Sequence, residues 1–264
     1  MKTLLRYPGG KAKAIKALLP YIPKDTKKVI SPFFGGGSLE FALSEQGIEV
    51  EGFDIFKPVV NFWKVVRYSP NELADKIQEY LPVTKEKFLY LQQNLREKND
   101  KLFKVDIEAA AIFFILNRCS FSGTTLSGGF SKEASTGRLT QSSIDKIRSF
   151  NSKIDVFAIP FEETIPKADG LLFCDPPYYL GNKSNLYGDN GDTHKNFNHE
   201  LLAELLKKKD NWILCYNNDP HIRKLYKDYE WCYPTGNMVC HQKKILKKFL
   251  LYAHELFINI GVSQ

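Results

Sequence analysis

Apolar runs of strand length alternate with segments of helical periodicity at both ends of the chain. The runs that predict strands are 28–30, 48–53, 155–159, 171–174, 212–216, 230–234 and 248–258. The segments that predict helices around them are 12–19, 39–44, 199–209 and 221–226. Such alternation is typical of an α/β fold with a mostly parallel sheet.

The middle of the chain has a different pattern, in which helical periodicity dominates. The predicted helices there are 59–66, 71–80, 85–96 and 107–116. A charged stretch, 94–104, predicts a solvated turn, and 120–143 is rich in Ser, Thr and Gly and predicts a long loop. We therefore expect an inserted helical domain, 57–151, within a core formed by 1–56 and 152–264. The polar loop either contacts nucleic acid or is a mobile surface loop.

The strand 171–174 leads directly into Asp175, Pro176, Pro177, Tyr178 and a second tyrosine. Proline cannot donate to a ladder, so the strand ends there and Asp175 stands at its carboxyl end, where open α/β sheets bind ligands. A carboxylate and a backbone carbonyl could accept the two N–H bonds of a nucleobase amine, and a tyrosine could stack on the base. The alternative is an ordinary strand end with a Pro-Pro turn.

A second motif is the glycine-rich turn 33–38, which lies between a predicted strand and a helix. The next strand ends at Asp54, 17 positions after Gly37. An acid at this spacing typically binds the ribose hydroxyls of a nucleoside. The spacing fits a dinucleotide or S-adenosylmethionine, but the turn lacks the fuller Gly-x-Gly-x-x-Gly pattern and the Gly-Lys-Ser/Thr ending of a phosphate loop.

The net charge of +7 favours a polyanionic partner such as nucleic acid. The five cysteines are odd in number and form no Cys-x-x-Cys pair, which argues against a disulfide framework and against a zinc site. No signal-peptide pattern is present, and the longest apolar run, 109–116, is too short to cross a bilayer. We expect a cytoplasmic monomer that uses no metal and no membrane.

These motifs together resemble the Dam-like (D12) class of DNA adenine-N6 methyltransferases, which use S-adenosylmethionine (SAM). The residues that carry the resemblance are Arg6 to Lys11, Phe33 to Ser38, Asp54, Asn117-Arg118 with Phe121 and Gly123, and Asp175 to Tyr178. The resemblance implies a Rossmann-like SAM-dependent methyltransferase three-layer sandwich with an inserted, mostly helical DNA-recognition domain.

It also implies roles for individual residues. Those implied for the cofactor are Tyr7, Lys11, Phe34, Gly35, Gly37, Ser38, Asp54, Phe161 and Asp175. Those implied for catalysis are Asp175, Pro176, Pro177 and Tyr178. Those implied for contact with DNA are Asn117, Arg118, Phe121, Ser122, Lys132 and Arg138.

The chain departs from the family pattern at three positions. Ser31 stands where the family usually has an acid before the proline of the glycine turn, and Pro160 stands where it usually has Asp. Leu126 stands where GATC-specific relatives have an arginine that reads guanine. The first two departures concern binding of the cofactor, and the third concerns the DNA sequence that is recognised.

We expect methyl transfer from SAM to the N6 amine of an adenine flipped out of double-stranded DNA. Two alternatives are cytosine-N4 methylation and a DNA-binding protein of this fold with weak or no turnover. Phe121 has two interpretations of equal weight. It either fills the hole that the flipped base leaves, or it packs under the polar loop as core.

Overall fold

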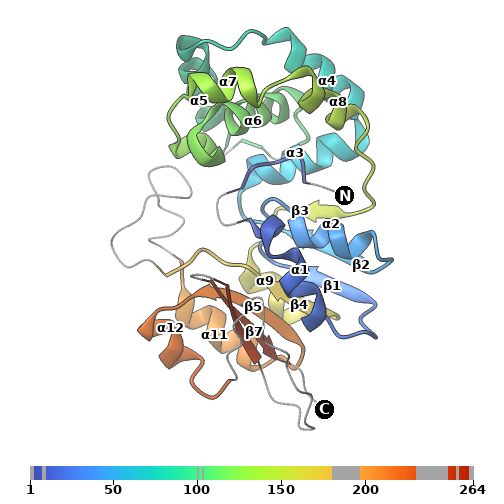
Figure 1. Cartoon of the computed structure of the whole chain (residues 1–264), viewed down its shortest axis with the longest axis vertical. Coiled ribbons are helices and arrows are strands. Elements are labelled where there is room, and N and C mark those ends of the chain that lie inside the picture. Colours follow the sequence, from blue (N-terminus) through green and yellow to red (C-terminus); the bar gives the residue numbers. More distant parts are fainter. Residues whose placement is uncertain are drawn as a thin grey trace.

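The computed structural model describes residues 3–7, 10–99, 101–102, 104–179, 197–229, 249–253 and 256–261 of the 264-residue chain. A sheet flanked by helices forms one end of the molecule, and a group of helices from the middle of the chain forms the other (Figure 1). Within these ranges, no helix combines the length and apolar character that a membrane span requires.

The sheet has five parallel strands. They are β1 (Lys28–Ser31), β2 (Glu49–Phe53), β3 (Asp155–Phe157), β4 (Leu171–Cys174) and β5 (Trp212–Asn217). With β6 (Phe249–Ala253) and β7 (Leu256–Gly261), the strand order across the described residues is β3-β2-β1-β4-β5-β7-β6. The order changes direction between β1 and β4, and ligands of open α/β sheets bind at the carboxyl ends beside such a point.

One predicted strand is wrong in form. The sequence pattern predicts a single strand over 248–258, but this segment contributes β6 and part of β7, which pair antiparallel with Leu250 opposite Asn259. Only two polar residues, His254 and Glu255, interrupt the apolar pattern, and they are not typical turn residues, so the sequence gives little signal for the reversal. The strand predicted at 230–234 lies outside the described residues.

Helices cover both faces of the sheet, because alternate residues of each strand enter different cores. Leu171 and Phe173 of β4 pack with α1 (Ile15–Leu18) and α2 (Ser38–Ser44). Leu172 and Cys174 pack with α9 (Phe161–Lys167), α11 (His199–Lys207) and α12 (Pro220–Leu225). This arrangement confirms the three-layer α/β sandwich. The helix α9 was not predicted, and 12–19 forms α1 flanked by the short 3-10 helices η1 (Lys11–Lys13) and η2 (Leu19–Tyr21).

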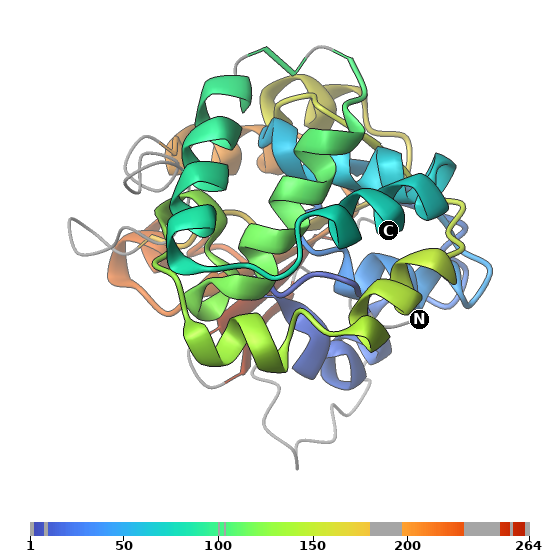
Figure 2. The same ribbon diagram turned by 90° about the horizontal axis from the view of Figure 1, so that it is seen from above.

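The helices of the middle region are α3 (Lys57–Tyr68), α4 (Pro70–Glu79), α5 (Lys85–Asn99), α6 (Ile107–Cys119), α7 (Lys132–Gly137) and α8 (Gln141–Arg148). Seen from above, α6 lies among the other helices (Figure 2). Residues 109–117 of α6 are all buried, as expected of a helix that is apolar on every side. The division into two domains at 57 and 151 remains a prediction.

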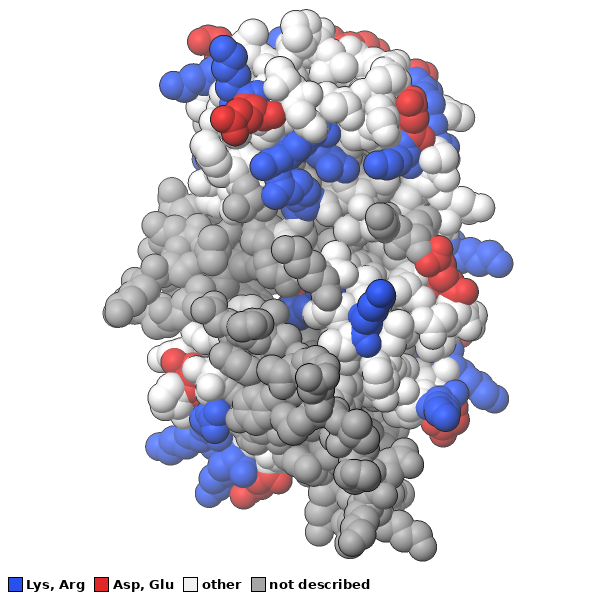
Figure 3. Space-filling view, in the orientation of Figure 1, with Lys and Arg blue, Asp and Glu red and all other residues white. Residues whose placement is uncertain are grey.

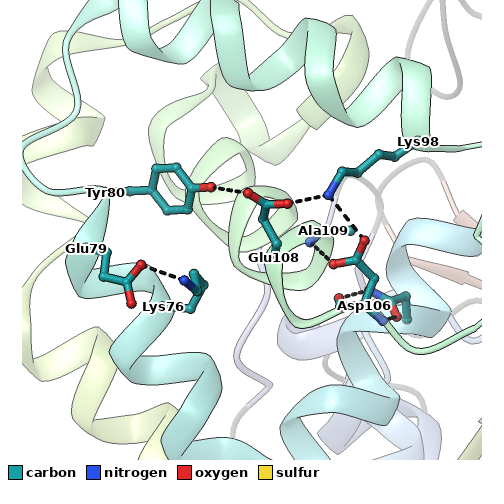
Figure 4. A network of polar contacts seen from close by, with 8 residues as sticks. Lys76, Glu79, Tyr80, Lys98, Asp106, Glu108 and Ala109 are labelled. Atoms are coloured by element: carbon teal, nitrogen blue, oxygen red, sulfur yellow. Dashed lines mark hydrogen bonds and ion pairs between the residues drawn. The ribbon is translucent and has the colours of Figure 1, made fainter.

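A polar network fixes the start of α6. The ammonium of Lys98 on α5 binds the carboxylates of Asp106 and Glu108, and the hydroxyl of Tyr80 donates to Glu108 (Figure 4). Asp106 also caps α6 by accepting a 2.8 Å hydrogen bond from the amide of Ala109. Hydrogen bonds from Lys98 and then Tyr80 lower the pKa of Glu108. The network therefore connects the end of α4, the end of α5 and the first turn of α6.

The prediction of a long loop at 120–143 is wrong, because this segment contains the 3-10 helices η3 (Phe121–Gly123) and η4 (Thr125–Ser127), all of α7 and the start of α8. Its small polar residues act as caps, since Ser131 accepts from the amide of Ala134 and Thr140 from that of Ser143. The amide of Gln92 donates to two carbonyls of the segment. The turn expected at 94–104 is also partly wrong, because α5 continues to Asn99.

Candidate active site

A pocket of about 730 Å³ lies at the carboxyl ends of β1, β2 and β4. Its walls come from the glycine turn 33–38, from Asp54, from 160–162 at the start of α9, and from 175–178. Residues 123–126 of the helical region form another part of the wall. Every residue implied for the cofactor or for catalysis lines this pocket, although the separate roles of those residues remain predictions.

The glycine turn takes a shape that needs glycine at Gly37. Gly37 has a φ of 63°, and a Cβ atom there would lie 2.7 Å from the ring of Phe34. The Phe34 ring is buried against Phe41 and Trp63, and the indole of Trp63 donates to the carbonyl of Gly35 over 2.8 Å. Aromatic side chains thus support the turn from the protein interior, and the residues of the turn line the pocket.

Asp54 is tied to this turn by its carboxylate, which accepts hydrogen bonds from the amides of Gly35 at 2.8 Å and Phe56 at 2.9 Å. Burial raises the pKa of Asp54 to about 6, although both hydrogen bonds act in the opposite direction. The carboxylate still lines the pocket. A buried acid in this position suits a ligand that donates hydroxyl hydrogen bonds.

Asp175 forms the centre of a compact polar group. The Nζ atom of Lys11 lies 2.5 Å from each carboxylate oxygen of Asp175 and 2.7 Å from the hydroxyl of Tyr178. Burial raises the pKa of Asp175, and the nearby Lys11 ammonium partly offsets that effect. The carboxylate therefore accepts from an ammonium of this chain inside the pocket, and its role toward a nucleobase amine remains a prediction.

Phe161 lies at the first position of α9, with its ring 5.5 Å from that of Phe33 and 5.1 Å from that of Phe197. All three line the pocket. The sequence indicated Phe161 by resemblance alone, and Phe197 was missed because an isolated aromatic before a helix has no distinctive signal. Flat apolar rings in the same pocket as Asp54 suit a nucleobase.

Glu40 is a pocket residue that the sequence reading missed. It lies in the first turn of α2, is 3% exposed, and accepts a 2.7 Å hydrogen bond from the hydroxyl of Ser31. A single acid near a helix start normally reads as a favourable charge on the helix dipole. Only its burial beside Ser31, the first position that departs from the family pattern, could have marked it.

The prediction that Asn117 contacts DNA does not fit the structure, because its side chain is fully buried. Its amide donates to the carbonyls of Arg6 and Gly123 and accepts from the amide of Arg6. All of these partners are backbone groups of this chain, so nothing is presented to solvent. Gly123 lies close to the backbone of Arg6, since a Cβ atom at Gly123 would lie 2.2 Å from the carbonyl oxygen of Arg6.

Arg118 and Arg138 lie near Arg6, from the amino-terminal segment. Burial, followed by the neighbouring arginine charges, lowers the pKa of Arg6 and of Arg118. Within the described ranges no carboxylate forms an ion pair with any of the three. Lys132 is exposed on α7, and Figure 3 shows Lys and Arg side chains on the helical region where it faces the sheet. Such a cluster suits phosphate groups.

Phe121 and Leu126 have opposite environments. Phe121, in η3, is 63% exposed, so the interpretation of Phe121 as ordinary core is wrong. Leu126, in η4, is 3% exposed, and this side chain is not available to a base. Ser122 lies in η3 beside Phe121. The exposed aromatic leaves the base-flipping interpretation of Phe121 open for test.

Comparison with known proteins identifies the family of this chain. Residues 7–239 match the family described as D12 class N6 adenine-specific DNA methyltransferases. The type II methyltransferase M1.LlaDCHI of Lactococcus lactis subsp. cremoris is 23% identical over 249 residues, which cover 87% of this chain and 86% of the relative. The type II methyltransferase M.MjaIII of Methanocaldococcus jannaschii is 24% identical over 236 residues, which cover 80% and 81%.

A DNA N-6-adenine-methyltransferase of Escherichia phage P1 is 24% identical over 240 residues, which cover 86% of this chain but 31% of that longer protein. The family match extends over most of the chain, and the motif residues from its two ends meet at one pocket of a methyltransferase fold. On this evidence the chain belongs to the D12 class of N6 adenine-specific DNA methyltransferases.

Proposed function

We propose that S-adenosylmethionine is the methyl donor and that the target adenine leaves the duplex to reach Asp175. The observation that carries the proposal is the meeting of Asp54 and Asp175, from neighbouring parts of one sheet, in a pocket of about 730 Å³. That volume lies within the range of small-molecule sites. A donor bound along the glycine turn would lie between the two acids.

The residues present fit such a donor. Asp54 would accept the ribose hydroxyls, and the rings of Phe33, Phe161 and Phe197 would hold the cofactor adenine. Pro160 offers this adenine no side-chain hydrogen bond, so ring contacts would have to carry its recognition. SAM, when bound, would supply an electrophilic methyl group.

Asp175 and the carbonyl of Pro176 would accept the two N–H bonds of the target amine. Those bonds draw the nitrogen lone pair out of the conjugated ring and aim it at the methyl group, so positioning supplies much of the rate. Tyr178 would stack on the flipped base, and its ring already lines the pocket. An adenine still paired in the duplex could not reach these groups.

Double-stranded DNA would lie against the helical region. Arg118, Arg138 and Lys132, with Arg6, would neutralise phosphates, and Phe121 would enter the base stack. Such contacts give affinity that falls as salt concentration rises. The recognised sequence would come from other side chains, because Leu126 is buried.

The test is methylation of genomic DNA by the purified protein with labelled SAM, followed by digestion to nucleosides and mass spectrometry. We expect the label in N6-methyl-2′-deoxyadenosine. Label in N4-methylcytosine would instead support the cytosine alternative. Binding of DNA without label in any base would support the alternative of a binding protein with little turnover.

A further inference from the structure

Glu40 places a carboxylate in the wall of the pocket, separate from the two acids considered so far. It is 3% exposed, and the hydroxyl of Ser31 donates to its Oε1 atom over 2.7 Å. Ser31 is the last residue of β1 and is fully buried. The strand beneath the glycine turn and the helix after it therefore hold this acid between them.

The electrostatic surroundings of Glu40 leave its negative charge poorly compensated. Burial raises the pKa of Glu40 to about 7, the Ser31 hydrogen bond lowers it, and among charged groups Asp175 raises it and Lys11 lowers it. The Glu40 charge also contributes to the raised pKa of the buried Cys215 thiol on β5. Among the described residues Glu40 forms no ion pair, since the Lys11 ammonium binds Asp175. A buried carboxylate of this kind is costly unless a cation joins it.

We propose that Glu40, oriented by Ser31, binds the ammonium group of the amino-acid part of the methyl donor. This inference rests on the proposed function, because it takes SAM as the ligand of the pocket. Asp54, at the end of β2, would bind the nucleoside part, so the amino-acid part extends past the end of β1, where Ser31 and Glu40 lie. Ser31 stands where the family pattern has an acid, and Glu40 supplies a carboxylate that accepts a hydrogen bond from Ser31.

Two ligands separate this role from a purely structural one. S-adenosylhomocysteine keeps the ammonium but lacks the sulfonium charge, and 5′-methylthioadenosine lacks the amino-acid part altogether. A residue that binds the ammonium affects only the first ligand. A residue that merely shapes the glycine turn affects both.

Proton release provides a second readout. Because the ordinary pKa of a glutamate is 4.5 and that of Glu40 is about 7, much of the Glu40 population is protonated near neutral pH. An ammonium that binds the ionised form would displace that proton. Binding of S-adenosylhomocysteine should therefore be tighter at about pH 8 than at about pH 6, with net proton release that titration calorimetry in two buffers of different ionisation heat can count.

The experiment is calorimetry of both ligands with the wild-type chain, with Glu40→Gln and with the control Glu49→Gln, an exposed acid on β2. Loss of a charged hydrogen bond should weaken S-adenosylhomocysteine binding to Glu40→Gln by about ten-fold or more and remove the proton release. Binding of 5′-methylthioadenosine and all binding by Glu49→Gln should stay unchanged. The double variant Ser31→Asp, Glu40→Gln should recover most of the lost affinity.

Equal weakening of both ligands by Glu40→Gln, or no weakening of either, would overturn the inference and leave the proposed cofactor in place. A wild-type chain that binds neither ligand would instead remove the proposed function itself. If Glu40→Gln does not fold, the proton count on the wild-type chain decides. Release on binding S-adenosylhomocysteine but not 5′-methylthioadenosine supports the role, and no difference between the ligands refutes it.

Discussion

The Nζ atom of Lys11 lies at hydrogen-bond distance from both carboxylate oxygens of Asp175, 2.5 Å from each. This ion pair occupies the acceptor atoms that a target amine would need. The proposed reaction therefore requires Lys11 to share or release Asp175 when the base enters. The pair also explains how an acid can lie in this pocket although burial raises its pKa.

Asp175→Asn tests the catalytic role with little change of shape. We expect turnover to fall by about 10²–10³-fold or more, because an acceptor of the transition state is lost. Duplex binding should be largely kept, since phosphate contacts supply most of the affinity. Labelled methyl incorporation and a DNA binding titration on the same preparation check this. Near-normal turnover would remove Asp175 from the mechanism.

Lys11→Met tests the electrostatic contribution of the ion pair. The Lys11 ammonium lowers the pKa of Asp175, so its removal should raise that pKa further. The acidic limb of the pH profile of kcat should then move to higher pH. Lys16→Met, an exposed lysine on α1, is the control and should leave the profile in place. An acidic limb in the same position for both variants would contradict the pairing.

Asp54→Asn tests the ribose site. Loss of a charged acceptor should weaken SAM binding by about 1–3 kcal/mol, measured by calorimetry without DNA. In the variant only one of the two amides, that of Gly35 or that of Phe56, keeps an acceptor oxygen, so thermal unfolding of the variant checks that the turn is still formed. Unchanged affinity would mean that Asp54 serves only to hold the turn.

Phe121→Ala tests the wedge role of an exposed aromatic. Because Phe121 is 63% exposed, folding stability should barely change, while methylation should slow. The slowing should be relieved when the target adenine is mispaired, since less unstacking energy is then needed. Phe130→Ala is the control, because Phe130 packs on Phe88 and its loss should lower the unfolding temperature. A slow variant that mispairing does not rescue would end the wedge interpretation.

Stability should depend on pH through Glu40. Folding raises its pKa from 4.5 to about 7, so the folded state binds the proton more tightly than the unfolded state. The contribution of Glu40 to stability therefore falls as pH rises from about 4.5 to about 7. Relative to the wild type, Glu40→Gln should gain on the order of 1–3 kcal/mol of unfolding free energy between pH 5 and pH 8. Urea unfolding at both values measures it, and an equal pH dependence in the two chains would exclude a raised pKa.

The sequence allowed the five parallel strands and the position of Asp175 to be predicted, because a strand that ends at Asp175-Pro176 leaves few alternatives for the position of the acid. The sequence was misleading where the role of a residue depends on contacts with residues far away in the chain. From the sequence, Asn117 beside Arg118 was interpreted as a recognition residue, but its amide is hydrogen-bonded to the backbone of Arg6, far away in the sequence, and of Gly123. Glu40 looks like an ordinary surface acid until the fold places it against Ser31.

The contacts of Asn117 have a consequence for how the pocket and the helical region are connected. One amide connects the backbone of Arg6, a short distance along the chain from Lys11, to the carbonyl of Gly123 in the turn that exposes Phe121. Asn117 thus holds together the amino-terminal segment, whose Tyr7 lines the pocket, and the turn that exposes Phe121.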